Sequence, residues 1–346
     1  MTNTSNSQTK TIIATEQAVT VTGTGAAERV TGNVLANNMK GGKGADTLEG
    51  LAGNDTYQVD DPGDVIIEQQ KAGIDTVIAT VSYTLPEWVE HLKLKGTAAM
   101  AGQGNGLDNT LTGTAGDNWL DGGDGIDTVS YRGARGAVTV NLALPTPQNT
   151  GGAGNDTLLN FERVIGSSFG DTLTGNEGRN TLIGGQGADT LNGAGGRDQL
   201  VGGAGADYFV LSNPDGTAIM SDFTPGVDRI IIDSTLLPIG NGDDVIDGMT
   251  VVEGLAGFSP EAEYVRFDSR LTASLNPDTA AAVIRAADKP FALRHSALFI
   301  VSNQKQTGIF HFEASDVDNR VASHELKLIG LVTGLEMDPS DLILMS

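Results

Sequence analysis

The stretch that decides the fold is residues 166–210, which reads GSSFGDTLT, GNEGRNTLI, GGQGADTLN, GAGGRDQLV and GGAGADYFV in successive blocks of nine. The five copies share one register, with the consensus Gly-Gly-x-Gly-x-Asp-x-apolar-x. Further copies begin at Gly23, Gly32, Gly41, Gly50, Gly104, Gly113, Gly122 and Gly151. A fixed period kept over long stretches predicts a repeat architecture in which each copy packs on its neighbours.

Each position of this nonad has a physical role. Glycine at positions one, two and four permits positive φ and a tight turn, which leaves backbone carbonyls free to point toward a common centre. The apolar residue at position eight lies in a short extended stretch, and its side chain should face inward. Two nonads then make one coil, with parallel strands stacked in two sheets. We therefore predict an all-β protein built as a parallel β-roll.

In such a roll, loops two nonads apart lie above one another on the same edge, so that their position-six side chains form ladders. The predicted stacks are Asp171 with Asp189 and Asp207, Asn180 with Asp198, Glu28 with Asp46, and Asn37 with Asp55. The block at 104–130 adds Asn109, Asn118 and Asp127 at the same position.

The ligand chemistry of these loops favours calcium. Carbonyl and carboxylate oxygens are the ligands that Ca²⁺ prefers, six to eight of them at about 2.3–2.6 Å. The chain has no cysteine and only four histidines, so the ligands typical of transition-metal sites are scarce. The predicted side-chain ligands are Asp46, Asp55, Asp127, Asp156, Asp171, Asn180, Asp189, Asp198 and Asp207. We expect several ions, with weaker sites where Asn or Glu replaces Asp; Asp75 is either a further ligand or a turn residue.

The composition agrees with a cationic partner. Of 346 residues, 47 are glycine, and 21 Lys and Arg face 44 Asp and Glu, for a formal charge of −23. Such an acidic chain is not expected to bind nucleic acid. The sequence has no run of 18 apolar residues, and we predict no transmembrane span.

Over residues 23–233 the chain resembles the RTX (repeats-in-toxin) family of hemolysin-type calcium-binding proteins. The resemblance rests on the nonads and on spacers such as DTYQVDDPGDVIIE at 55–68, and SDFTPGVDRIIID at 221–233 resembles the segment that closes such rolls. It implies a calcium-binding β-roll in which carbonyls at positions one, two and four join the aspartate. The implied carbonyl ligands include Gly184, Gly185, Gly187, Gly202, Gly203 and Gly205.

We predict three regions along the chain. They are a flexible N-terminus at 1–22, the roll at 23–233 with insertions at 59–103 and 131–150, and a C-terminal mostly-β module at 234–346. In the last region, a polar linker is expected at 241–248. A helix is expected at 276–288 with Asn276 as its cap. The runs ALFIVS, TGIFHFEA and HELKLIGLV predict strands.

The C-terminal residues, DPSDLILMS, resemble the uncleaved signal of type I secretion substrates, although a last strand after Asp341 would look the same. Together with the repeats, they favour export of a bacterial protein by the type I secretion machinery to the cell surface or the medium. In a calcium-poor cytosol the carboxylate ladders would keep the chain unfolded. Calcium outside, near the 10⁻⁴–10⁻³ M range typical of extracellular modules, would fold it.

Three functional classes remain open. The first is a non-enzymatic structural, adhesive, surface or host-interaction protein, in which self-assembly can occur. The second is a calcium-dependent polysaccharide-binding module or accessory part of an RTX enzyme, and the third is an RTX enzyme or toxin. We favour the first, because the one nucleophile motif, GSSFG at 166–170, lies in nonad register without the strand-turn-helix that this motif requires.

Two kinds of isolated side chain have a structural interpretation. Trp88 and Trp119 could stack on sugar rings, but packing in the core is favoured. His311 alternates with apolar residues in IFHFEA, which predicts a half-exposed histidine on a strand.

Overall fold

A computed structural model describes residues 10–233, 250–253, 264–271, 275–286, 296–303, 305–313, 321–333, 337 and 341–345. These residues form two compact units. Unit one comprises residues 10–136 and 144–165, and unit two comprises 137–143 and the described residues from 166 onward. The predicted linker at 241–248 lies outside the described residues.

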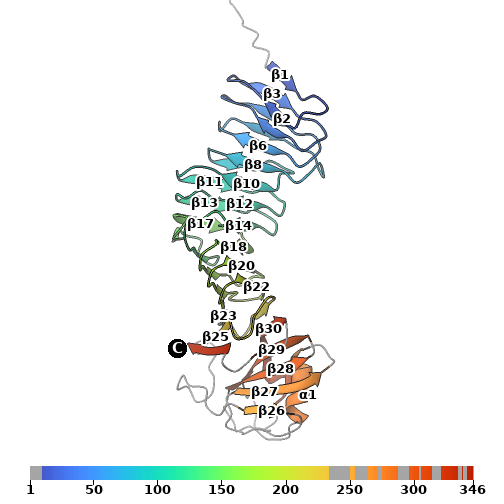
Figure 1. Ribbon diagram of the computed structural model, residues 1–346, viewed down its shortest axis with the longest axis vertical. Helices are drawn as coiled ribbons and strands as arrows, with labels where there is room; N and C mark the ends of the chain where they lie inside the picture. The colour runs from blue at the N-terminus through green and yellow to red at the C-terminus, as the bar shows by residue number, and fades with distance from the viewer. Residues whose placement is uncertain are drawn as a thin grey trace, which may run out of the picture. The chain divides into compact units, whose positions relative to one another are not determined.

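Unit one is a solenoid of short, mostly parallel strands (Figure 1). One face consists of β2 (Thr20–Thr22), β4 (Asn38–Lys40), β6 (Thr56–Val59), β8 (Thr76–Ala79), β10 (His91–Leu94), β12 (Thr110–Thr112), β14 (Thr128–Ser130) and β18 (Arg163–Ile165). Another sheet consists of β1 (Lys10–Ile13), β3 (Glu28–Thr31), β5 (Thr47–Glu49) and β7 (Val65–Ile67). A third consists of β9 (Tyr83–Thr84), β11 (Met100–Gln103), β13 (Asn118–Asp121), β17 (Asn155–Leu159) and the antiparallel β16 (Gln148–Asn149).

Unit two begins with the same architecture. One parallel sheet consists of β15 (Thr139–Asn141), β19 (Thr172–Thr174), β21 (Thr190–Asn192), β23 (Tyr208–Leu211), β25 (Arg229–Asp233) and β31 (Leu342–Met345). The other starts with β20 (Thr181–Gln186), β22 (Arg197–Ala204) and β24 (Thr217–Met220), and continues through β30 (Leu326–Thr333), β29 (Gln306–Glu313), β28 (Ser296–Asn303), β27 (Tyr264–Leu271) and β26 (Thr250–Glu253). The segments predicted as insertions also supply strands, among them β7 to β11 and β15.

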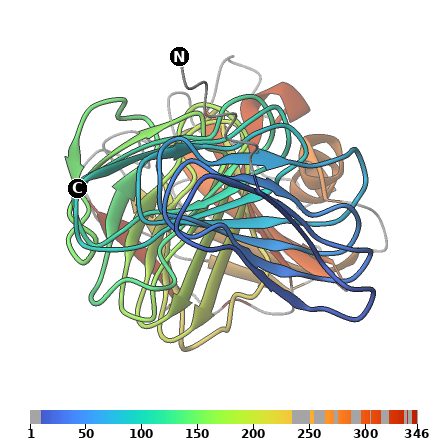
Figure 2. The same cartoon turned by 90° about the horizontal axis from the view of Figure 1, so that it is seen from above.

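The register confirms the coil of two nonads. Leu173 pairs with Leu191, and Leu191 with Phe209, each 18 residues further along the chain. Seen from above, the turns of each roll overlie one another (Figure 2). The position-eight side chains form the core as predicted, because every one is at most 2% exposed. They are Leu48, Tyr57, Leu111, Leu120, Val129, Leu158, Leu173, Leu182, Leu191, Leu200 and Phe209.

The elements predicted after residue 275 are present. Helix α1 (Pro277–Ala286) begins after Asn276, whose Oδ1 accepts the N–H of Thr279 at 2.9 Å, the bond expected of an N-cap. Ala280 and Ile284 on the helix share a buried cluster with Phe299 of β28. The three predicted strands are β28, β29 and β30, which pair in antiparallel fashion. The short 3₁₀ helix η1 (Ser323–Glu325) precedes β30.

Two sequence-based expectations were wrong. His311 is only 3% exposed, because β29 lies between β28 and β30 and is buried on both faces. Trp119 is 40% exposed instead of packed in the core. Its neighbour Leu120 takes the inward position of β13, and the alternation of a strand then turns Trp119 outward.

The residues after Asp341 form a strand. β31 pairs in parallel with β25, with Leu342 opposite Ile230. The apolar C-terminal run therefore extends one sheet of unit two. None of the helices among the described residues is long and apolar enough to cross a membrane.

Candidate metal-binding loops

The position-six side chains are buried and linked from turn to turn by hydrogen bonds. Asp189 Oδ1 accepts the backbone N–H of Asp171 at 2.6 Å, and Asp207 Oδ1 accepts that of Asp189 at 2.9 Å. Asp198 Oδ1 accepts the N–H of Asn180 at 2.9 Å. The corresponding pairs Glu28 with Asp46 and Asn37 with Asp55 are 2.8 and 2.6 Å apart. The predicted stacking is thus confirmed, with one carboxylate oxygen of each aspartate used to align the turns.

The loops fall into two classes, which differ in whether the backbone N–H of position two donates to the side chain at position six. In the first class, here called open loops, the residue at position two has positive φ and position six is aspartate. Position two is Gly42, Leu51, Gly123, Gly185, Ala194 or Gly203, and position six is Asp46, Asp55, Asp127, Asp189, Asp198 or Asp207. The Oδ2 atoms of Asp46, Asp55, Asp127 and Asp189 are buried without a hydrogen-bond partner.

In the second class, here called closed loops, position two is Thr, Asn or Ser, and its N–H donates to the side chain at position six. Asn176 N–H donates to Asn180 Oδ1 at 2.8 Å, for example. The other pairs are Thr24 with Glu28, Asn33 with Asn37, Asn105 with Asn109, Thr114 with Asn118, Ser167 with Asp171, and Thr224 with Asp228. In five of the seven, the side chain at position two also accepts the N–H of position four, a local turn that holds the loop shut.

The predicted side-chain ligands fall in different environments. Two of them, Asp171 and Asn180, lie in closed loops. Six lie in open loops: Asp46, Asp55, Asp127, Asp189, Asp198 and Asp207. Asp156 Oδ1 accepts the N–H of Asn118 at 2.9 Å. Its Oδ2 accepts hydroxyl hydrogens from Tyr131 and Thr150 at 3.1 and 3.2 Å. The chain itself therefore supplies donors to Asp156, Asp171 and Asn180.

The glycines of the open loops make room for these oxygens. A Cβ on Gly184 or Gly202 would collide with Oδ2 of the aspartate in its own loop, and one on Gly203 would meet the carbonyl oxygen of Gly185. Likewise, a Cβ on Gly205 would meet the carbonyl oxygen of Gly187. Gly185, Gly187, Gly203 and Gly205 all have positive φ, between 100° and 152°. Carbonyl and carboxylate oxygens, the donor set of a hard cation, therefore lie close against the predicted glycines.

Several members of the ladders were not predicted. Asp64 Oδ1 accepts the N–H of Asp46 at 2.9 Å, and Asp228 Oδ1 that of Asp207 at 2.9 Å. Glutamates do the same: Glu90 Oε2 accepts from Asp75, and Glu162 Oε2 from Asp127, both at 2.8 Å. Asp64 directly precedes the apolar strand β7 (VII), and Asp228 directly precedes β25 (RIIID). An aspartate placed just before a short apolar strand, as at position six of the nonad, is the signal that these two positions share with the predicted ligands.

Burial makes these carboxylates hard to ionise. Burial, with the like charges of Asp171 and Asp207, raises the pKa of Asp189 to about 7. Burial raises the pKa of Asp198 to about 7 and that of Asp127 to about 6. A negative charge held away from water needs a compensating positive charge, which none of the described ion pairs provides to these three groups.

Two of the open loops, those with Leu51 and Ala194 at position two, have a residue with a side chain there at positive φ. Ala194 has φ of 66°, where a residue with a Cβ costs about 1–2 kcal/mol. We expect Ala194→Gly to raise the free energy of unfolding by roughly 0.5–1 kcal/mol, after the larger chain entropy of glycine is subtracted. Urea denaturation at saturating calcium measures this. Ala188→Gly, at a position without positive φ, should lower stability, and a matching decrease for Ala194→Gly would contradict the assignment of strain.

Comparison with known families agrees with this geometry. The family model of the RTX calcium-binding nonapeptide repeat matches four copies in the chain, at residues 12–60, 103–133, 165–200 and 183–211. These matches support assignment of the chain to the RTX family, and the matched repeats are of the calcium-binding kind. A search of curated proteins gives no significant match.

Proposed function

We propose that this is a secreted RTX protein whose roll folds when Ca²⁺ fills the open loops outside the cell. Its role is non-enzymatic, and is structural, adhesive, at a surface or in contact with a host. The observation that carries the proposal is the set of buried, unpartnered Oδ2 atoms of Asp46, Asp55, Asp127 and Asp189. Burying a charged oxygen without a partner is costly, and a hard cation with six to eight oxygen ligands removes that cost.

The residues that would hold each ion come from successive turns. Beside Asp189, these are its own Oδ2 and the carbonyl oxygens of Gly185 and Gly187, which face the next loop. When bound, the ion neutralises the carboxylate and cross-links neighbouring turns. Because each turn contacts only its neighbours, binding energy becomes folding energy, and we expect cooperative folding along the stack.

A calcium titration of the full chain tests this proposal. We expect a sigmoidal gain of β structure by far-UV circular dichroism together with a fall in hydrodynamic radius by light scattering, and neither with magnesium. A hyperbolic titration without a change in secondary structure would contradict calcium-coupled folding. Growth into large assemblies after compaction would support a surface or matrix role over a soluble one.

Export is supported by the repeats and by the acidic-then-apolar C-terminus. The test is secretion from a bacterium carrying a type I exporter, with the full chain compared with a variant lacking residues 338–346. We expect the truncated chain to remain in the cells. Equal secretion of both would remove the C-terminus from the export proposal.

A groove in unit one favours polysaccharide binding as a second candidate function. It has a volume of about 580 Å³, and its lining includes Pro62, Tyr83, Gln103 and the half-exposed Trp119. An exposed indole beside polar groups offers a flat apolar face for a sugar ring. Affinity electrophoresis in polysaccharide gels tests this: Trp119→Ala should abolish retardation, and Phe169→Ala, at a comparably exposed aromatic outside the groove, should preserve it. Equal mobility of all three proteins would reject the second candidate.

A further inference from the structure

The turn between Asp55 and Asp75 departs from the repeat. Thr56 of β6 pairs with Thr76 of β8, so that this turn contains 20 residues where the regular turn contains 18. On the other face, Glu49 pairs with Ile67. Glu68 consequently takes the register position that Gly50 holds one turn earlier. A carboxylate stands where the nonad has its first glycine.

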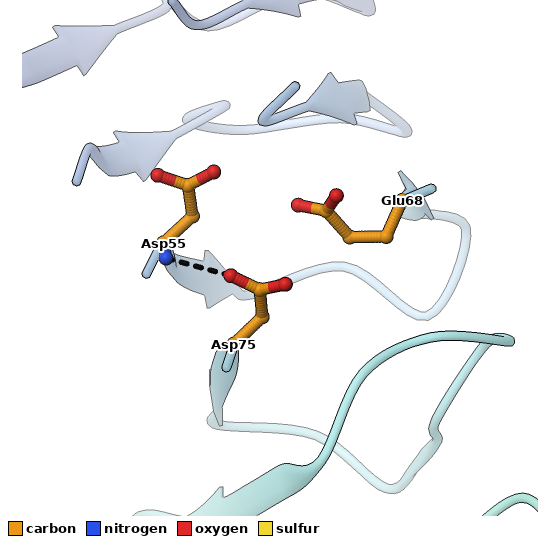
Figure 3. Close-up of side chains that lie close together, drawn as sticks. All are labelled: Asp55, Glu68 and Asp75. Carbon is orange, nitrogen blue, oxygen red and sulfur yellow. Dashed lines mark hydrogen bonds between the residues drawn. The ribbon is translucent and has the colours of Figure 1, made fainter. Parts of the chain in front are cut away.

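This substitution brings three carboxylates together. One oxygen each of Asp55, Glu68 and Asp75 lie within 4.8 Å of one another. Figure 3 shows Glu68 reaching from the end of β7 toward the two aspartates. A Cβ on Gly50 would meet both Asp55 Oδ2 and Glu68 Oε1, which places these two oxygens beside the same point.

Two of the three carboxylates direct unpartnered oxygens into the cluster. Asp55 and Asp75 are each 1% exposed. Their Oδ1 atoms accept the N–H groups of Asn37 and Asp55, at 2.6 and 2.7 Å. Their Oδ2 atoms are buried and have no hydrogen-bond partner. Alignment of the turns therefore uses only one oxygen of each aspartate and leaves the other to a ligand.

The chain provides little to balance these charges. Glu68 Oε1 accepts the hydroxyl hydrogen of Tyr57, and Glu68 Oε2 accepts the N–H of Gln69 at 3.2 Å. The ion pairs within the described parts of the chain all involve other carboxylates. Two buried carboxylates beside the partly buried Glu68 repel one another when ionised, and a shared proton or a bound cation relieves that repulsion.

We propose that Asp55, Glu68 and Asp75 hold one Ca²⁺ in a site unlike the other open loops, because the aspartate of the loop 50–55 shares its ion with two further carboxylates. The identity of the ion rests on the proposed function. A loop such as 184–189 offers the cation one free carboxylate oxygen and otherwise carbonyls, whereas this site offers three carboxylates. Because affinity for Ca²⁺ rises with the number of charged ligands, this site is the tightest in unit one and fills first as calcium rises.

The test is a competition titration of the full chain with Ca²⁺ against a chelating dye. Glu68→Gln removes one charged ligand, and the matched control Glu87→Gln removes the same charge from an exposed residue. We expect Glu68→Gln to weaken the tightest site about tenfold or more and Glu87→Gln to change nothing. Circular dichroism at saturating calcium shows whether each variant folds.

Terbium luminescence provides a measurement that needs no altered ligand. Tyr57 touches Glu68, so a lanthanide at this site should be sensitised by tyrosine excitation in the wild-type chain. Tyr57→Phe should lower the emission that appears at the lowest terbium concentration. Unchanged emission in Tyr57→Phe would overturn the site.

The outcomes separate the two proposals. No calcium binding by the wild-type chain would overturn the proposed function and this site together. Calcium binding that is identical in wild type and Glu68→Gln would overturn only this inference, and would assign the three carboxylates to a cluster that shares protons.

Discussion

In calcium-free solution, raising the pH from about 4 to about 7 is expected to destabilise the roll. The aspartates have an ordinary pKa of about 3.9 in the unfolded chain. In the folded chain, burial raises the pKa of Asp189 and Asp198 to about 7 and that of Asp127 to about 6. Over this interval the folded state binds more protons than the unfolded state. Its stability therefore falls as pH rises, and the loss is complete once the pH exceeds the folded pKa values.

Calcium should reverse this dependence. An ion that binds the ionised carboxylates favours the folded state at neutral pH and releases protons when it binds near pH 6. Thermal melts by circular dichroism at several pH values, with chelator and with saturating calcium, measure both effects. The result that contradicts the expectation is a calcium-free stability that does not change between pH 4 and 7.

The core and the stacking of the roll could be predicted because the period of nine encodes both. Leu173, Leu191 and Phe209 recur at one position, and any sequence with that spacing must bury them together in parallel strands. The same arithmetic places Asp189 between Asp171 and Asp207. Residue type and spacing are therefore enough to predict the core and the stacked side chains wherever each turn repeats the previous one.

The difference between open and closed loops was not predicted, because it depends on a backbone direction. At position two, Asn176 directs its N–H to Asn180, whereas Gly185, with φ of 121°, leaves Asp189 Oδ2 without a donor. The consensus treats both loops as copies of one motif. The residue type at position two carries the distinction: a polar side chain that forms a local turn closes the loop.

Glu68 was not predicted as a site residue, and the expectation for Trp119 was wrong, for a related reason. Glu68 lies in a spacer, and only the pairing of Glu49 with Ile67 shows that it replaces a glycine. Trp119 has the size of a core residue, but the alternation of β13 gives the inward position to Leu120. Irregular turns break the period, and register there is fixed by pairing with neighbouring strands.

Exchange of the two loop types is expected to move a calcium site along the stack. The closed loop 175–180 becomes a consensus open loop in the double variant Asn176→Gly with Asn180→Asp, which removes the internal donor and adds a carboxylate. The carbonyl oxygen of Gly193 in the next turn already faces Gly175. We therefore expect this variant to bind one more calcium ion than wild type and to fold at a lower calcium concentration.

The reverse exchange gives the matched control. Gly185→Asn with Asp189→Asn supplies the donor and removes the charge, so that the loop 184–189 should close and calcium stoichiometry should fall by at least one. Asn180→Asp alone keeps the N–H of Asn176 on the position-six oxygen, as in the native pair Ser167 and Asp171, and should gain little affinity. Calorimetric titration distinguishes these cases. Equal calcium stoichiometry in all variants would mean that position two does not govern binding. A gain in the first double variant and a loss in the second would establish the opposite: the N–H of position two decides whether a turn satisfies its own carboxylate or requires an ion.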